Sequence, residues 1–115
     1  MSFSLLVKKQ DAVFVLTAKG YVHLDEGMEI RKKVHSYLEQ GEKVFLVDFT
    51  EAPIITSLAL SQILEMVAEV ISNDSLVVFA GLSSTAKITF QTVGLLEYAT
   101  DYETIDEALT SLKGK

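Results

Sequence analysis

Hydrophobic residues along this chain follow two different periods, and the changes between them predict where strands and helices lie. Residues 3–9 alternate imperfectly between apolar and more polar positions, and residues 12–18 form a second run rich in Val and Leu. Both runs are typical of strands. Gln10 and Asp11 lie between them, so we expect a hairpin with a tight turn at these two residues.

Two uninterrupted apolar runs follow later in the chain. Residues 44–47 read VFLV and residues 76–80 read LVVFA, the pattern of strands that are covered on both faces or lie centrally in a sheet. We expect the first of these strands to end at Asp48. Tyr98 and Thr100 indicate a last short strand near the end of the chain.

Between the strands, apolar residues recur at the helical spacing of three and four residues. We expect four helices. The first follows Gly20 and ends at Gly41, and the second follows Pro53 and ends at Asn73-Asp74. The third is capped within Ser83-Ser84-Thr85 and ends at Gly94, and the fourth begins at the capping-box pattern of Thr104 and Glu107. Their expected apolar positions are, in order, Ile30, Val34, Tyr37 and Leu38; Leu60, Ile63, Leu64, Val67, Val70 and Ile71; Phe90 and Val93; and Ile105, Ala108, Leu109 and Leu112.

The order of these elements, ββαβαβαβα, defines the fold class. It predicts an α/β protein with a mixed, mostly parallel sheet whose later strands are joined by right-handed βα crossovers. The chain has 115 residues and contains neither an internal repeat nor a linker. We therefore expect residues 1–115 to form a single domain.

Charge and composition exclude several classes of partner. The formal net charge is −6, which would repel a phosphate backbone, so nucleic acid is not an expected partner. No apolar run reaches the ~18 residues of a membrane span, and the first residues lack the pattern of a signal peptide. We expect a cytoplasmic protein without membrane insertion. The absence of cysteine excludes disulfides and thiol chemistry.

The sequence contains no recognisable catalytic or cofactor-binding motif. The glycines form no phosphate-binding loop, no G-x-S-x-G surrounds a serine, and His23 and His35 lie twelve residues apart rather than in H-E-x-x-H. We expect no cofactor, no metal and no enzymatic activity, and a structural role for His35 on the first helix. A small enzyme would instead require a deep pocket with convergent acids or histidines.

The most informative stretch runs from residue 44 to residue 64. A buried strand there ends in an acid, a short turn passes through Pro53, and Thr56 and Ser57 stand where the second helix begins. Either hydroxyl can cap the helix by accepting a hydrogen bond from a backbone N–H of its first turn, which stabilises by about 1 kcal/mol.

This stretch and the order of the elements resemble the STAS domain family, the fold of bacterial anti-sigma factor antagonists. The resemblance extends over nearly the whole chain, through Gly20, Val44 to Asp48, Pro53, Ser57, Leu60, Gly81, Gly94-Leu95 and Glu107-Ala108-Leu109. It implies successive βα units with the strands in sequential order, and a regulatory role exerted by binding another protein.

The resemblance also implies a site and a partner. In such antagonists the serine at the start of the second helix, here Ser57, is phosphorylated by the anti-sigma factor, itself a kinase, and phosphorylation releases the partner. The family commonly has an aspartate before this serine, a glycine two residues after it and an acid near the end of the second strand. This chain has Thr56, Ala59 and His23 there, and Thr56 is the alternative phosphorylation site.

Two binding functions remain open at this stage. The first is an antagonist whose partner is an anti-sigma factor or a related serine kinase or ATPase. The second is a non-phosphorylated STAS accessory subunit of a lipid-transport ABC ATPase system. A homodimer is compatible with either function.

We expect three turns to form one contact face, namely residues 22–25, 54–58 and 82–85. The carboxyl ends of parallel strands, and the helix starts that follow them, lie at one edge of such a sheet, where binding sites concentrate. The residues expected to contact a partner are His23, Asp25, Ile55, Thr56, Ser57, Leu58, Ser83 and Ser84.

Overall fold

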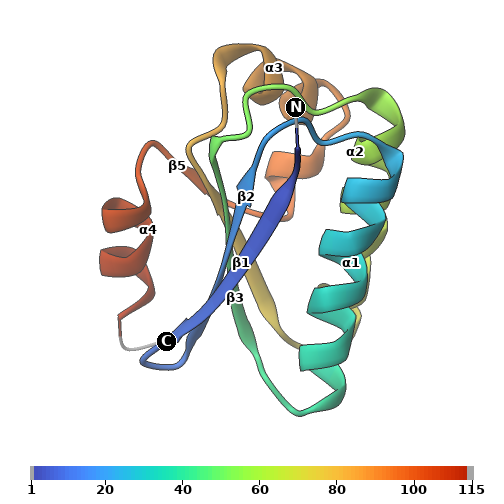
Figure 1. Cartoon of the computed structure of the whole chain (residues 1–115). Coiled ribbons are helices and arrows are strands. Elements are labelled where there is room, and N and C mark those ends of the chain that lie inside the picture. The colour runs from blue at the N-terminus through green and yellow to red at the C-terminus, as the bar shows by residue number, and fades with distance from the viewer. Residues whose placement is uncertain (1, 114–115) are drawn as a thin grey trace.

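Strands and helices alternate along the chain in the expected order, in a computed structural model that describes residues 2–113 (Figure 1). The strands are β1 (Ser4–Gln10), β2 (Val13–Lys19), β3 (Val44–Glu51), β4 (Leu76–Ala80) and β5 (Asp101–Tyr102). The α-helices are α1 (Leu24–Glu39), α2 (Ser57–Ser72), α3 (Ser84–Thr92) and α4 (Ile105–Leu112), and a short 3-10 helix, η1 (Leu95–Glu97), follows α3.

The five described strands form one sheet in the sequential order β1-β2-β3-β4-β5. β1 pairs antiparallel with β2, and every later pair is parallel. This confirms the expected α/β class with a mixed, mostly parallel sheet. Because β2, β3 and β4 run in the same direction, the turns that follow them emerge at one edge of the sheet, at the top of Figure 1.

The sheet separates two hydrophobic cores of unequal size. The larger core lies between the sheet and α1, α2 and α3, and it contains the mutually tilted rings of Phe49, Phe79 and Phe90. The smaller core lies under α4, which covers the opposite face of the sheet from α1 and α2 (Figure 1). The buried runs of β3 and β4 contribute alternate residues to both cores, which explains why they are apolar without interruption.

β3 does not end at Asp48 as expected but continues to Glu51. Asp48 remains in the strand although it is only 7% exposed, because its Oδ1 accepts hydrogen bonds from the Thr50 N–H at 3.0 Å and the Thr50 hydroxyl at 2.5 Å. A satisfied carboxylate does not have to terminate a buried strand. The hairpin turn is also shifted by one residue, since β1 includes Gln10, and Asp11 takes the positive φ of 56°.

The expected last strand around Tyr98 and Thr100 is displaced along the chain. Gly94, with φ +78°, ends α3 and starts η1, and β5 comes only at Asp101. Tyr98 is left 70% exposed. The last strand is therefore present but begins three residues after Tyr98, because Tyr98 directly follows the 3-10 turn of η1.

The ends of α1 and α2 confirm the expected stop signals. The N–H groups of Gly41 and Glu42 bind the carbonyls of Leu38 and Tyr37, and the N–H groups of Asp74 and Ser75 bind those of Ile71 and Val70. Both ends are Schellman motifs, in which one residue must take positive φ. Gly41 does so at +90° in α1, and Asp74 at +54° in α2.

Gly81 lies where β4 leaves the sheet, directly against β3. Its φ is +71°, and a Cβ at this position would come within 2.8 Å of both the Cα and the backbone nitrogen of Thr50. The turn that leads into α3 can therefore pass this close to β3 only if residue 81 is glycine.

We predict that Gly81→Ala destabilises the protein by about 3 kcal/mol, because it combines a disfavoured φ with a clash against backbone. Gly41→Ala is the matched control: its φ is +90°, but nothing lies within 4 Å of the added Cβ, so it should cost only about 1 kcal/mol. Urea unfolding of the two variants measures the difference. Equal losses would show that Thr50 does not constrain this turn.

His35 connects α1 to α2 on the outer surface of the helix pair. Its Nδ1 is hydrogen-bonded to the carboxylate of Glu69, and its Nε2 lies 3.3 Å from Glu39. The hydrogen bond and the negative charge of Glu69 raise the pKa of His35 above its ordinary value; desolvation and Arg31 oppose this shift, and Glu39 adds to it. His35 thus has the structural role that we expected, as half of an interhelical ion pair.

Because the pKa of His35 is raised on folding, its contribution to stability is fully present below the unfolded pKa of about 6.5 and is lost as the pH rises through the higher folded pKa. We predict that His35→Gln lowers the unfolding midpoint more at about pH 5.5 than at about pH 8.5. Thermal melts of both proteins at the two pH values provide the measurement. If the difference in unfolding midpoint between wild type and His35→Gln were the same at both pH values, this role for the ion pair would be contradicted.

Candidate functional site

Backbone hydrogen bonds tie the turn after β2 to the turn after β3. Val22 and Ile55 form an isolated parallel bridge beyond the named strands. The Val22 N–H donates to the Ile54 carbonyl, and the Thr56 N–H donates to the Val22 carbonyl, each at 3.0 Å. The start of α1 and the start of α2 are therefore held side by side by main chain.

The turn after β4 joins the same edge. The Ser83 hydroxyl donates to the Pro53 carbonyl at 2.9 Å and also accepts from the Ala86 N–H, which makes Ser83 the N-cap of α3. The three turns that we expected to form one face are thus brought together. A partner contact by these residues stays a prediction.

Thr56, and not Ser57, caps α2. The Thr56 Oγ1 accepts a hydrogen bond from the Ala59 N–H at 3.2 Å, and Ser57 is the first residue of the helix. The Ser57 side chain is exposed, and it makes no side-chain hydrogen bond to any residue between 2 and 113 that the structure describes. The two hydroxyls that the sequence could not distinguish therefore have different environments.

His23 is the N-cap residue of α1 and faces the cap of α2. Its Nδ1 lies 2.9 Å from the Thr56 Oγ1, and its backbone N–H donates to the Glu26 side chain at 3.1 Å. The ring of Tyr21 packs against the His23 ring in an edge-on arrangement. The hydrogen bond between His23 and Thr56 couples the first turns of the two helices through their side chains.

Gly27 allows α1 to approach α2 closely. A Cβ at Gly27 would lie 3.0 Å from the Cα of Ala59 and 3.1 Å from its carbonyl oxygen, so any larger residue would push the helices apart. Ala59 is fully buried at this contact. The spacing of the two helix starts therefore depends on the pair of small residues, Gly27 and Ala59.

The expected contact residues differ in how accessible they are. His23, Asp25, Ser57, Leu58 and Ser84 are exposed, whereas Ile55, Thr56 and Ser83 are half-buried. Leu58 is 53% exposed and projects from the first turn of α2. The three half-buried residues shape the face through their hydrogen bonds and the bridge to Val22.

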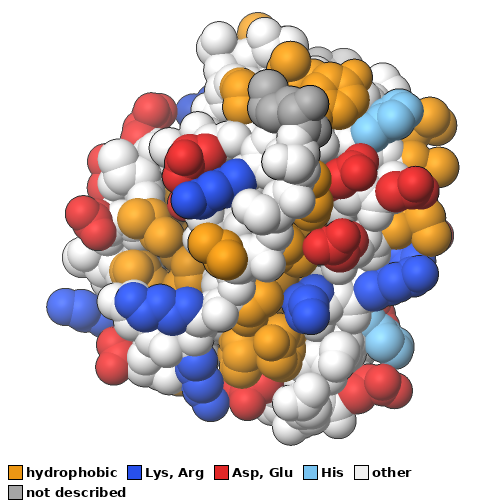
Figure 2. Space-filling view, viewed as in Figure 1, with side chains coloured by type: hydrophobic (Ala, Val, Ile, Leu, Met, Phe, Trp, Pro, Cys, Tyr) orange, Lys and Arg blue, Asp and Glu red, His pale blue; other side chains and the backbone are white. Residues whose placement is uncertain are grey.

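Sequence reasoning missed Tyr21, which precedes the expected turn 22–25, and it placed Ile54 within the turn 54–58 without naming it among the contact residues. Both are exposed hydrophobic side chains, Ile54 at 54%, and both belong to the turns joined at the bridge between Val22 and Ile55. Figure 2 shows hydrophobic side chains beside a histidine at the end of the molecule where α1 and α2 begin. The available signal was a large apolar residue directly after a turn residue, since Tyr21 follows Gly20 and Ile54 follows Pro53.

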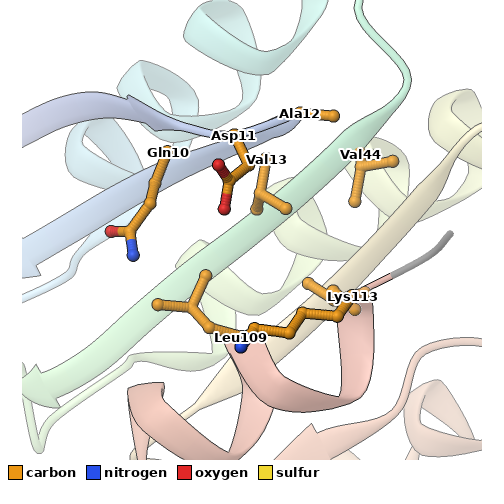
Figure 3. A pocket seen from close by; sticks show the side chains of 8 residues that line it. Gln10, Asp11, Ala12, Val13, Val44, Leu109 and Lys113 are labelled. Carbon is orange, nitrogen blue, oxygen red and sulfur yellow. The ribbon is translucent and has the colours of Figure 1, made fainter.

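A cavity of about 210 Å³ lies at the opposite edge of the sheet, between the β1–β2 turn and α4 (Figure 3). Val13, Val44 and Leu109 line it together with Asp11 and Lys113. Asp11 is its one acidic lining residue, and its lining includes no histidine. This lining does not provide the convergent acids or histidines that we would require of an active site.

From residue 2 to residue 113, no group of three or more His, Asp or Glu side chains is placed to hold a metal ion. No helix in the same range combines the length and hydropathy needed to cross a membrane.

The fold is similar to those of several solved anti-sigma factor antagonists. One from Thermotoga maritima is 17% identical and superposes with a TM-score of 0.85 over 95% of this chain and 94% of its own. One from Mycobacterium paratuberculosis is 16% identical, with a TM-score of 0.83 over 97% and 95%. The Bacillus cell fate determinant SpoIIAA, in its phosphorylated form, is 21% identical, with a TM-score of 0.75 over 97% and 100%.

At these identities the structural likeness shows a shared fold. No curated protein sequence matches the chain at a significant level. The model of the STAS domain family, by contrast, matches residues 4–108, which include every strand and the first three helices. The chain belongs to the STAS domain family.

Proposed function

We propose that this protein is a regulatory protein-binding module of the anti-sigma factor antagonist type. In this proposal, an anti-sigma factor or a related serine kinase or ATPase binds the face formed by the three turns, and a phosphate on Ser57 releases it. The observation that carries the proposal is the exposed Ser57 hydroxyl, which stands at the start of α2 beside the exposed side chains of Ile54 and Leu58.

The geometry favours Ser57 over Thr56 as the phosphate acceptor. The Thr56 Oγ1 already accepts from the Ala59 N–H and is hydrogen-bonded to His23. Phosphorylation of Thr56 would remove the N-cap, which stabilises by about 1 kcal/mol, and would break the side-chain hydrogen bond to His23. Ser57 can react without loss of either contact.

A phosphate on Ser57 affects folding and binding in opposite ways. At the start of a helix, negative charge is favoured by the free N–H groups and the helix dipole by about 0.3–1 kcal/mol, so the fold tolerates it. In a complex, the same charge must be desolvated next to Ile54 and Leu58, both apolar and exposed. That cost weakens binding while the protein remains folded.

The similar structures support the general type of function that we propose. Those of Thermotoga maritima and Mycobacterium paratuberculosis are described as anti-sigma factor antagonists, and SpoIIAA was solved in a phosphorylated form. Three residues of this chain differ from the usual family pattern, namely His23, Thr56 and Ala59. Thr56 is hydrogen-bonded to both of the others, and the Ser57 hydroxyl remains accessible.

We predict that Thr56→Ala lowers the stability by about 1 kcal/mol, a fall of about 4 °C in Tm, because it removes the N-cap of α2. Ser57→Ala should leave Tm nearly unchanged, and Ser57→Asp should leave it unchanged or raise it slightly. Differential scanning calorimetry of the three variants tests this order. A large loss of stability in Ser57→Asp would mean that Ser57 is not at the surface of the protein.

We predict that the partner kinase and Mg-ATP place phosphate on Ser57, located by mass spectrometry, and that Ser57→Asp weakens partner binding about a hundredfold or more. Ser57→Ala should bind as wild type does. Ser36→Asp adds the same charge to an exposed serine of α1 outside the face, and it should also bind normally. Calorimetric titration gives the affinities.

Two results would contradict the proposal. If Ser57→Asp binds the partner as tightly as wild type, the charge at this position does not control binding. If affinity capture yields a transporter ATPase and no phosphate appears on residues 56 and 57, the protein is instead an accessory subunit of such a system.

A further inference from the structure

The cavity between the β1–β2 turn and α4 has apolar walls and a charged rim. Four aliphatic side chains form the walls, namely Val13, Val44, Leu109 and Leu112. Val13 and Leu112 are only 6% and 5% exposed, and both belong to the smaller core. The packing of α4 on the sheet therefore fixes the shape of these walls.

Two opposite charges face the cavity from different elements. Asp11 lies in the turn of the hairpin, and Lys113 directly follows α4. The Asp11 side chain points from the hairpin towards α4, on whose side the Lys113 side chain lies (Figure 3). Both residues are exposed, and neither forms an ion pair with any other residue between 2 and 113. The rim thus presents a carboxylate and an ammonium group to a ligand.

The hairpin fixes the backbone at Asp11 without help from a ligand. Gln10 and Val13 are paired across the turn, and Asp11 has a φ of 56°. Aspartate and asparagine adopt this left-handed conformation more readily than other residues that carry a side chain. The carboxylate therefore starts from a defined position beside the aliphatic walls.

We propose that this cavity binds a free aliphatic amino acid in its zwitterionic form. The ammonium group of the ligand lies at the Asp11 carboxylate, its carboxylate lies at the Lys113 Nζ, and its side chain rests on the aliphatic walls. Each charge of the ligand then meets the opposite charge, and such charge-assisted hydrogen bonds are stronger than neutral ones. Gln10, which also points from the hairpin towards α4 in Figure 3, adds a neutral polar group beside Asp11.

The two charges favour a zwitterion over ligands of any other charge. An anion would be attracted by Lys113 and repelled by Asp11, and a cation would experience the reverse. An uncharged apolar molecule would remove water from both charged groups without replacing their hydrogen bonds. A ligand that carries both charges satisfies both sides of the cavity.

The volume and the walls restrict the rest of the ligand. The cavity measures about 210 Å³, whereas the sites of drug-sized ligands usually measure about 300–1,000 Å³. This size fits one amino acid better than a peptide or a nucleotide. The described residues that line the cavity include no aromatic ring on which a base could stack. Aliphatic walls instead complement a branched aliphatic side chain, such as that of leucine.

A ligand in this cavity would connect the hairpin to the C-terminal helix. It contacts Asp11 and Lys113 together only while α4 is docked on the sheet, so its binding stabilises that docking by mass action. The cavity and the three turns lie at opposite edges of the sheet. Binding therefore leaves Ser57 and its surroundings accessible.

Titration of the full chain with L-leucine, followed by ¹H–¹⁵N NMR, tests the site. We expect saturable shifts at residues 10–13 and 109–113, with a Kd below about 1 mM. At about ten times Kd, Tm should rise by about 5 °C, and amide hydrogen exchange in α4 should slow. N-acetyl-leucine and leucine amide each lack one charge, so each should bind about tenfold more weakly or worse.

Variants of the two charged residues test the assignment from the side of the protein. Asp11→Asn and Lys113→Gln should each weaken leucine binding about tenfold, and asparagine preserves the turn because it tolerates positive φ. Asp74→Asn is the matched control. Asp74 also has a positive φ, of 54°, but it lies at the end of α2, so this variant should bind leucine as wild type does. Circular dichroism checks the fold of each variant.

Three results would overturn the site: no saturable shift up to about 10 mM leucine, shifts that lie outside the cavity, and wild-type affinity in both Asp11→Asn and Lys113→Gln. Equal binding of leucine and N-acetyl-leucine would show that the ammonium group is not recognised, which contradicts a zwitterion site. None of these results concerns the phosphorylation of Ser57, so the proposed function stands or falls separately.

Discussion

The short main-chain bridge between Val22 and Ile55 is the constraint on which the rest of the site depends. It extends the parallel pairing of β2 and β3 past the point where the strands end, so that two consecutive helices begin side by side. Without it, the hydrogen bond between His23 and Thr56 and the close contact of Gly27 with Ala59 would have no fixed geometry. The chemistry at the start of α2 is thus set by backbone pairing and only then refined by side chains.

The three departures from the usual family pattern are not independent of each other. His23 is hydrogen-bonded to Thr56, and Thr56 accepts from the backbone of Ala59, which in turn packs on Gly27. The contact between His23 and Thr56 is a hydrogen bond of 2.9 Å between the two side chains. The methyl group of Ala59 is accommodated because α1 presents a glycine to it. These substitutions therefore form one connected unit around an unchanged serine.

Much of the fold could be predicted because the controlling interactions are local. Helical and strand periods, positive-φ residues such as Gly41, and the rule that parallel strands end at one edge identified the elements and the three turns. Features that depend on side-chain hydrogen bonds or on packing between elements were missed. The continuation of β3 past Asp48 depends on a hydrogen bond from Thr50, and the choice of Thr56 as N-cap depends on how the chain enters α2. Leu64 and Ile71, which we expected on the apolar face of the second helix, are 36% and 44% exposed, because their exposure depends on how much of α2 its neighbours cover.

The interior is divided into two cores, and the C-terminal segment packs on the smaller one. β5 contributes only two residues to the sheet, and α4 rests on the smaller core, with Ala108 and Leu112 as its buried residues. The residues that join the starts of α1 and α2, namely Val22, Ile55 and Ala59, belong to the larger core or pack against it. The last segment, from Asp101 onward, can therefore detach as a local unfolding unit at a lower free energy than the rest of the sheet. Such an excursion would expose β4 as a new edge and release the Gly81 N–H from the Tyr102 carbonyl, while the bridge between Val22 and Ile55 stays in place.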